Sequence, residues 1–273
     1  MKELKIGKRN STFQHILVIK NNRHKRFENK EIFVEGVRNI KLALKYGWKI
    51  KYWIYEKYEE LSNWARQTIK QYQAQENLSL TKELMIEVSG KSNTSEIIAI
   101  FEMKKMKINI DQIYEAPLFV LFDRPSKKGN LGSIIRSADA FGINGIIVTG
   151  HSVDIYDPEI IGATMGSYFT IPIEKIDTNE EVLELFNKLK EIYPNLQIIS
   201  TTELGEKNIN EIDYKNASIL MIGNESMGLS KFLLENSNMH VKIPMVGEAS
   251  SFNAACAGSI FMYQAFINRN TKK

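Results

Sequence analysis

The sequence predicts an α/β protein with two domains, of which the C-terminal one is built on a mostly parallel sheet. Its 273 residues are long for one domain and can bury a sizeable core, with 43% of them hydrophobic. A polar, charged stretch, Lys104–Glu115, interrupts the apolar pattern and ends at Ala116-Pro117. We therefore predict a small α/β domain over residues 1–105, a linker over 106–116 and a second domain over 117–273.

In the N-terminal half, apolar residues alternate between strand-like and helix-like spacing. In Gly36–Tyr46, the residues Val37, Ile40 and Leu44 lie on one helical stripe. Strands are expected at Glu31–Val34, Lys49–Tyr55, Leu78–Leu80 and Ile97–Phe101, and helices at Gly36–Tyr46, Glu59–Gln75 and Thr81–Val88. Phe13–Lys20 fits a helix or a strand, and Asn22–Arg26 is expected to be an exposed basic stretch.

The pattern is clearer from Leu118 onward, where the continuous apolar run Leu118–Phe122 is typical of a buried parallel strand. Strands are expected at Leu118–Phe122, Gly145–Thr149, Gln197–Thr201, Ser218–Ile222 and Val241–Ile243, and helices at Leu131–Phe141, from Asp157-Pro158, at Glu180–Ile192 and at Phe252–Ile267. Because strands alternate with helices, the sheet should be mostly parallel. Ligands of such sheets bind beyond the carboxyl ends of the strands.

The charge is unevenly distributed. The net charge is +4, yet residues 1–50 contain thirteen Lys and Arg against four Asp and Glu, so the remainder is net negative. This concentration suggests a surface that faces phosphates, with Arg23, Lys25 and Arg26 as candidate contacts, although a solvated basic face without a partner remains the alternative. The single cysteine, Cys256, excludes an intrachain disulfide framework, which favours a reducing, cytoplasmic compartment, and it is expected to be inert core. No apolar run is long enough to predict a transmembrane span.

Three loops that follow predicted strands contain polar residues and glycines. The first, residues 129–136, offers Asn130 as a short donor and acceptor and Arg136 as a bidentate anion ligand. The second, 223–230, places Glu225 between two glycines, where it could bind a ligand hydroxyl or pair with Arg136. Read alone, the first is also compatible with a tight turn and the second with a loop whose Ser230 caps a short helix.

The third loop runs from Ile243-Pro244-Met245 through Gly247 to Ser250-Ser251-Phe252-Asn253, which opens an apolar helix. Either Ser251 or Asn253 could simply cap that helix. The helix begins with small residues that allow close packing against another helix or a ligand. The sequence lacks the glycine-rich signature of a Rossmann site, a phosphate-binding loop and a zinc-ligand spacing, so we expect no metal.

Together these residues resemble the SpoU/TrmH family of SPOUT RNA methyltransferases. The pattern of that family, Asn and Arg in the first loop, Gly-Asn-Glu and Gly in the second, and Ile-Pro-Met with Ser and Asn in the third, is matched in order over residues 117–273. Around Phe33–Gly36 the N-terminal half resembles the RNA substrate-binding domain that often precedes this catalytic domain. The overall layout also resembles the thiostrepton-resistance type of ribosomal RNA methyltransferase.

The resemblance implies a SPOUT domain with a deep trefoil knot and a homodimer whose active site uses both subunits. It implies that S-adenosylmethionine binds at the second and third loops, through Gly223, Ile243, Met245, Gly247 and Phe252. Phe252 replaces the usual leucine of the family, which keeps an apolar wall of different shape. The stretch Ile161–Thr164 lacks an arginine that many members carry, which puts one RNA contact in doubt.

The implied reaction is methyl transfer to a ribose 2′-hydroxyl of RNA, most simply ribosomal RNA. Since a guanidinium rarely deprotonates, we expect Arg136 to hold the RNA phosphate and polarise the hydroxyl, while an RNA phosphate or water accepts the proton. Asn130, Glu225, Ser251 and Asn253 would orient the arginine, the ribose and the cofactor. The alternatives are a transfer RNA 2′-O-methyltransferase, a base-modifying member of the fold and a non-catalytic RNA-binding member.

Overall fold

A computed structural model describes residues 3–112 and 116–271, so residues 113–115 of the predicted linker lie outside the described residues. The chain forms two compact units. The first consists of Met1–Lys105 with the segment Asp154–Thr170, and the second of Met106–Val153 with Ile171–Lys273. The sequence-based division groups Asp154–Thr170 with the second domain, whereas these residues pack within the first unit.

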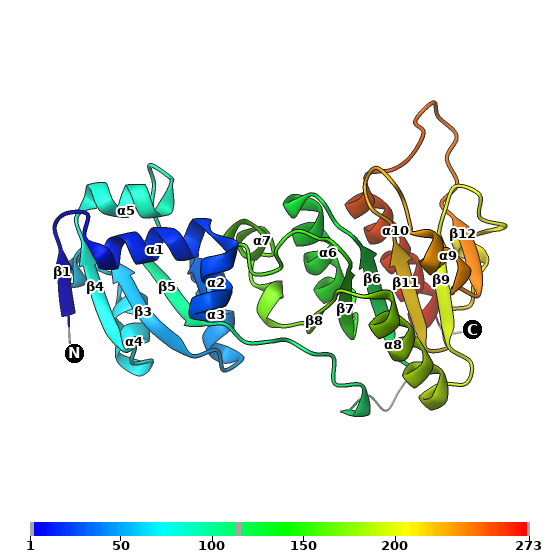
Figure 1. The fold of residues 1–273 in the computed structure, drawn as a ribbon, viewed down its shortest axis with the longest axis horizontal. Coiled ribbons are helices and arrows are strands. Elements are labelled where there is room, and N and C mark those ends of the chain that lie inside the picture. The colour runs from blue at the N-terminus through cyan, green and yellow to red at the C-terminus, as the bar shows by residue number, and fades with distance from the viewer. Residues whose placement is uncertain (1–2, 113–115, 272–273) are drawn as a thin grey trace. The chain divides into compact units, whose positions relative to one another are not determined.

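The first unit is built on a five-stranded mixed sheet in the order β1-β4-β3-β5-β2 (Figure 1). The central strands β3 and β4 are parallel to each other, and β5 runs antiparallel to both of its neighbours. The strands are β1 (Glu3–Ile6), β2 (Glu31–Glu35), β3 (Ile50–Tyr55), β4 (Glu76–Leu80) and β5 (Ile97–Glu102). The helices are α1 (Ser11–Asn21), α2 (Arg23–Asn29), α3 (Val37–Lys45), η1 (Tyr58–Glu60), α4 (Asn63–Gln71) and α5 (Lys82–Ser89).

The ambiguous segment Phe13–Lys20 is helical, as part of α1. Asn10 caps this helix, since its Oδ1 accepts a hydrogen bond from the Phe13 amide at 2.9 Å. Phe13, Ile16 and Ile19 are fully buried in the core of the first unit. The apolar residues of the segment therefore lie on one helical face, three residues apart, and β1 is a strand that the sequence did not indicate.

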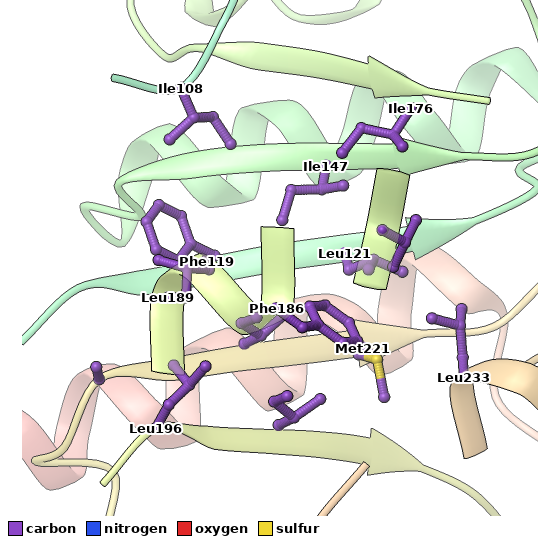
Figure 2. Close-up of a cluster of buried hydrophobic side chains, with 14 of the residues drawn as sticks. Ile108, Phe119, Leu121, Ile147, Ile176, Phe186, Leu189, Leu196, Met221 and Leu233 are labelled. Carbon is purple, nitrogen blue, oxygen red and sulfur yellow. The ribbon is translucent and has the colours of Figure 1, made fainter. Parts of the chain in front are cut away.

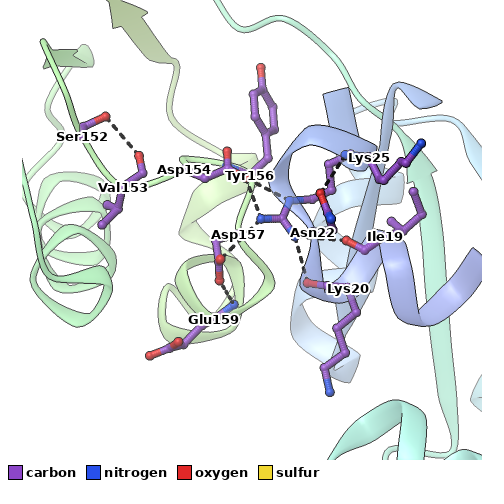
Figure 3. A network of polar contacts seen from close by, with 11 residues as sticks. Ile19, Lys20, Asn22, Lys25, Ser152, Val153, Asp154, Tyr156, Asp157 and Glu159 are labelled. Atoms are coloured by element: carbon purple, nitrogen blue, oxygen red, sulfur yellow. Dashed lines mark hydrogen bonds and ion pairs between the residues drawn. The ribbon is translucent and has the colours of Figure 1, made fainter. Parts of the chain in front are cut away.

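The expected exposed stretch Asn22–Arg26 is wrong in one respect, because it begins a helix, α2, that buries Arg26. Asn22 caps the helix by accepting from the Lys25 amide at 3.1 Å. The Arg26 side chain is 2% exposed and donates to the Asp154 carboxylate at 2.7 Å and 2.9 Å. It also donates to the carbonyl oxygens of Ile19 and Lys20 (Figure 3). The guanidinium therefore forms its hydrogen bonds with residues of the first unit.

The segment Asp154–Thr170 contains the short helices α7 (Pro158–Ala163) and η3 (Ser167–Phe169). Asp157 caps α7 by accepting from the Glu159 amide at 2.9 Å, with Pro158 at the first helical position as the sequence predicts (Figure 3). Both aromatic residues of η3 pack against Trp48. The ring of Tyr168 is tilted, with its centroid 6.0 Å from that of Trp48, and the ring of Phe169 packs edge to face at 5.3 Å. Aromatic contacts and the buried Arg26–Asp154 pair thus hold the segment in the first unit.

The second unit confirms the predicted parallel sheet: seven strands, all parallel to their neighbours, lie in the order β10-β12-β9-β11-β6-β7-β8. They are β6 (Leu118–Asp123), β7 (Gly145–Thr149), β8 (Ile173–Ile176), β9 (Gln197–Thr201), β10 (Lys207–Asn208), β11 (Ser218–Ile222) and β12 (Met239–Lys242). The short edge strands β8 and β10 were not expected from the sequence. Strand β12 begins two residues before the expected Val241.

The helices of this unit are α6 (Lys128–Ala140), α8 (Asn179–Ile192), α9 (Lys231–Glu235) and α10 (Ala254–Asn270), with η2 (Ile110–Gln112) and η4 (Ile209–Glu211) between strands. Phe186 and Leu189 of α8 pack with Phe119, Leu121 and neighbouring strand residues in one buried cluster (Figure 2). Helix α10 lies close to α6 and β11, because a Cβ on Gly258 would come within 2.3 Å of Ile134 Cδ1 and 2.5 Å of Ile222 Cδ1.

Two expectations about these helices need correction. Helix α6 begins at Lys128 rather than Leu131, so Asn130 lies in its first turn and not in a preceding loop. Cys256 was expected to be buried, but it lies on the exposed side of α10. Within the described residues, every helix is too short or too polar to cross a lipid bilayer.

Candidate active site

Glu225 connects the first two loops through four hydrogen bonds. Strands β6 and β11 are neighbours, so the residues beyond their carboxyl ends meet at one edge of the sheet. There the Glu225 carboxylate accepts from the Ser126 amide at 3.0 Å, the Ser126 hydroxyl at 2.7 Å and the Lys127 amide at 3.1 Å. Its fourth donor is Asn130 Nδ2 at 3.0 Å. Glu225 thus holds the start of α6 against the β11 loop.

These donors also set the charge of Glu225. Partial burial raises the pKa of this carboxyl, but the hydrogen bonds from Ser126 and Asn130 outweigh burial and lower the pKa to about 2. At neutral pH the side chain is therefore an anion that only accepts hydrogen bonds. A carboxylate this acidic is a poor general base, which makes Glu225 a positioning group.

The third loop joins the network at its last residue. Asn253 Nδ2 donates to Asn130 Oδ1 at 3.1 Å, while Asn253 Oδ1 caps α10 by accepting from the amides of Ala255 and Cys256. Of the two candidate caps, Asn253 is therefore the one used. The chain Glu225–Asn130–Asn253 links all three loops.

The second loop is a tight turn with little room. Asn224 and Gly228 exchange two backbone hydrogen bonds of 3.0 Å, and Asn224 Oδ1 accepts from the amides of Ser226 and Met227. A Cβ on Gly223 would lie 2.4 Å from the backbone of Gly228 and Leu229, so only glycine fits there. Ser230 caps α9, as one of the two readings of this loop proposed.

Sequence reasoning missed Asp123 and Arg124 at the end of β6. The buried Asp123 carboxylate accepts from the Thr149 hydroxyl at 2.9 Å and the Ser230 amide at 2.8 Å. Arg124 adopts a left-handed backbone, with φ of 49°, and its guanidinium donates to Gly228 O at 3.1 Å. The available signal was position: both residues directly follow the predicted strand Leu118–Phe122, and ligands of such sheets bind beyond the carboxyl ends of the strands.

Arg136 and most of the third loop lie outside this network. Arg136 is exposed on α6, and between it and the rest of the described chain there is no hydrogen bond or ion pair, so the suggested Glu225–Arg136 pair is absent. Ser251 and Gly247 are exposed, and none of the hydrogen bonds within the described residues joins Ser251 to Asn130 or Glu225. The segment between β12 and α10 projects away from the sheet (Figure 1).

The second and third loops expose apolar side chains. Met227 is 76% exposed, Val246 fully exposed, and Met245 and Phe252 about 40% exposed. Ile243 is half-buried at the beginning of the third loop. Exposed apolar side chains on loops that follow parallel strands are suited to contact a flat, partly apolar ligand.

The three candidate RNA contacts of the first unit do not share one environment. Arg23 and Lys25 are exposed on α2, where Lys25 pairs with Glu28 at 2.7 Å. Arg26 is buried and paired with Asp154, so we correct its assignment: it is a structural residue of the first unit.

The fold and this site define a class of two-domain protein. A small mixed-sheet domain precedes a parallel-sheet domain in which hydrogen bonds among Glu225, Asn130 and Asn253 join three loops. The SpoU rRNA methylase family matches residues 117–263, and the SpoU L30e-like domain matches residues 10–99. The chain belongs to the SpoU rRNA methylase family.

Similar proteins agree with this membership over the whole chain. The 23S rRNA (uridine(2479)-2′-O)-methyltransferase of Streptomyces viridochromogenes is 36% identical over 266 residues, which cover 97% of this chain and 92% of the relative. The structure of the SpoU methyltransferase AviRb from the same organism, in complex with AdoMet, matches with a TM-score of 0.87 and 35% identity, over 95% of this chain and 99% of that one. An AdoMet-bound rRNA methyltransferase from Sinorhizobium meliloti matches with a TM-score of 0.86 and 28% identity, over 99% of both chains.

Proposed function

We propose that this protein transfers a methyl group from S-adenosylmethionine to a ribose 2′-hydroxyl of ribosomal RNA. Family membership and the relative that methylates a 23S rRNA uridine at this position support the reaction and the substrate class. The observation that carries the proposal is the network Glu225–Asn130–Asn253, which unites the three loops that the sequence singled out.

The loops fit the cofactor. Gly223 allows the β11 loop to fold back tightly, and Met245 and Phe252 provide apolar surface for an adenine ring. We assign cofactor binding to Gly223, Ile243, Met245, Gly247 and Phe252. When bound, S-adenosylmethionine supplies an electrophilic methyl group on its sulfonium. The exposed segment 244–252 would close over it.

Arg136 is the residue we place against the RNA. It lies two turns along the helix whose start is fixed by Glu225, and its guanidinium is free to bind an RNA phosphate bidentately. There it polarises the 2′-hydroxyl, whose proton passes to an RNA phosphate or water. Asn130, Glu225, Ser251 and Asn253 position the ribose and the cofactor loops. The reaction is an in-line displacement, so positioning supplies much of the rate.

The protein would act as a homodimer with a knotted C-terminal domain. Tyr263, Phe266 and Ile267 of α10 are 52, 36 and 38% exposed, and the rings of the first two pack at tilted angles against Phe141 at the end of α6. Such an apolar surface is typical of a subunit interface. The knot is favoured by the sheet order, in which β11 lies between β9 and β6 while the chain beyond β12 returns to pack α10 on α6.

The N-terminal domain, residues 1–105, would select the RNA, with Arg23 and Lys25 as contacts, and residues 106–116 would link it to the catalytic domain at 117–273. Because its substrate is ribosomal RNA, the protein would work in the cytoplasm. Contacts from Arg23 and Lys25 to RNA phosphates would contribute affinity without reading the sequence of the RNA.

The experiment that tests this function measures methylation of ribosomal RNA and of transfer RNA with purified protein, followed by mass spectrometry of the nucleosides. We expect 2′-O-methylnucleosides in ribosomal RNA only. Arg136→Ala should lower kcat by at least about 100-fold with an unchanged cofactor Kd, whereas Lys190→Ala, an exposed cation on α8, should leave both unchanged. A base-methylated product, or full activity of Arg136→Ala, would refute the assignment.

A further inference from the structure

The first unit contains an open hollow of about 400 Å³ that the proposed reaction does not use. It lies where α1 crosses the first residues of β2, β3 and β4, next to the end of α2. Its polar lining includes Ser11, Thr12, His15, Asn29, Lys51 and Tyr52. A hollow of this size, with several polar groups converging on it, is in the range of sites for small organic ligands.

A buried carboxylate organises the hollow. The side chain of Glu31 is 2% exposed, and it pairs with His15 Nε2 at 2.6 Å and with the Lys51 ammonium. Burial raises the pKa of Glu31, but the hydrogen bonds from His15 and Lys51 lower it by more, so the group stays ionised at neutral pH. The side chains of His15 and Lys51 are 31% and 20% exposed. Glu31 therefore fixes two side chains whose remaining hydrogen-bonding positions are available to a ligand.

We propose that this hollow is a base pocket, which binds one unpaired nucleobase of the RNA. Sequence-specific recognition of RNA works mainly on unstacked bases, which stack on aromatic rings and hydrogen-bond through their edges. Tyr52 and His15 supply the aromatic rings, 6.2 Å apart and 73° to each other. The Lys51 ammonium donates and cannot accept, so it favours a base with carbonyl oxygens, such as uracil.

Charge distinguishes a base from a phosphate here. The carboxylates of Glu31 and Glu76 lie in the same lining as Lys51 and His15, so the hollow has no net positive charge. A phosphate would be repelled by both carboxylates, whereas a neutral base would not. The base pocket thus differs from the exposed cations Arg23 and Lys25. It deepens the proposed function, since it rests on RNA being the substrate, and it would give the N-terminal domain a means to read sequence.

Methyl NMR of the full-length protein tests the pocket directly, with uridine as the probe. Ile16 and Leu78 line the hollow, and Ile173 of the second unit serves as a reference. We expect uridine to shift the methyl signals of Ile16 and Leu78 with a Kd on the order of 1 mM. Tyr52→Leu, which keeps apolar volume without a ring, should abolish the shifts, and Tyr52→Phe should retain them. Absent shifts, or equal shifts with inorganic phosphate, would overturn the proposal.

Methylation kinetics on unmodified 23S ribosomal RNA provide the second readout. Tyr52→Leu should raise the KM for RNA roughly ten-fold, by loss of one stacked base, with kcat and the cofactor Kd unchanged. Tyr52→Phe should behave as the wild type, and thermal unfolding confirms that both variants fold. If RNA is methylated but Tyr52→Leu has a normal KM, the pocket is wrong and the function stands. If uridine binds but no RNA is methylated, the proposed function has failed instead.

Discussion

Replacing Glu225 with glutamine would test whether a single ionised carboxylate holds the site together. Each carboxylate oxygen accepts two hydrogen bonds, one oxygen from the Lys127 amide and Asn130, the other from the amide and hydroxyl of Ser126. In Glu225→Gln, an NH₂ group replaces one oxygen and faces two donors. The variant therefore loses the charge and at least one good hydrogen bond, without losing volume.

The magnitude follows from the pKa of this carboxyl, which burial alone would raise but which the hydrogen bonds lower from its ordinary 4.5 to about 2. That difference corresponds to at most about 3.4 kcal/mol, at about 1.36 kcal/mol per pH unit. The side chain is partly exposed, so solvent screening reduces the expected effect to about 1–2 kcal/mol. Because the folded pKa is the lower one, this stability is present above pH 4.5 and lost as the pH falls toward 2.

Urea unfolding of the wild type and of Glu225→Gln, at about pH 7 and about pH 3, measures this. We expect the wild type to be more stable by about 1–2 kcal/mol at the higher pH, and the difference to shrink at the lower one. Glu206→Gln, at an exposed glutamate of the same unit, is the matched control and should show neither effect. A difference that is absent, or constant between the two pH values, would refute the reasoning.

Three further variants test other parts of the molecule. Arg26→Met leaves Asp154 buried without its partner and should lower the free energy of unfolding by about 3–5 kcal/mol, measured by thermal unfolding. The double variant with Asp154→Leu should recover most of this stability. A loss below about 1 kcal/mol for Arg26→Met would contradict the structural role. Gly223→Ala forces the Cβ against backbone 2.4 Å away and should weaken cofactor binding in calorimetry at least about ten-fold, whereas Gly7→Ala, with open space around its Cβ and outside the three loops, should not. Lys25→Glu should weaken RNA binding and reduce the salt dependence by about one unit of slope; an unchanged slope removes this residue from the interface.

The parallel sheet and the loops of the site could be predicted because their signals are local. Leu118–Phe122 is an unbroken apolar run and Ser218–Ile222 is apolar after its first residue, and each is a buried strand of the expected length or one residue longer. Strands β8 and β10 escaped prediction because Ile173–Ile176 and Lys207–Asn208 are short edge strands with partly polar faces. Their pairing depends on the neighbouring strand and not on their own sequence.

Arg26 shows a different limit of sequence reasoning. It follows four basic or polar residues, so a charge count predicts that it is exposed. It is buried instead, because it forms an ion pair with Asp154, which lies 128 positions further along the chain. A partner that is distant in sequence allows a charged side chain to be buried, and the residues next to Arg26 in the sequence do not indicate that partner. The assignment of Asp154–Thr170 to the first unit escaped prediction for the same reason, since it depends on contacts with Arg26 and Trp48.

The hydrogen bonds of the site separate its residues by role. Asn130, Glu225 and Asn253 use their polar atoms on one another and on the backbone of α6 and α10, so they fix geometry before any ligand binds. Arg136 keeps its guanidinium exposed on the helix that they anchor. An arginine held only through its backbone has its donors available for an RNA phosphate, and it does not have to break a protein ion pair to reach it. Changes in the network should therefore affect stability and cofactor binding together, whereas changes at Arg136 should affect turnover and RNA binding and leave stability and cofactor binding unchanged.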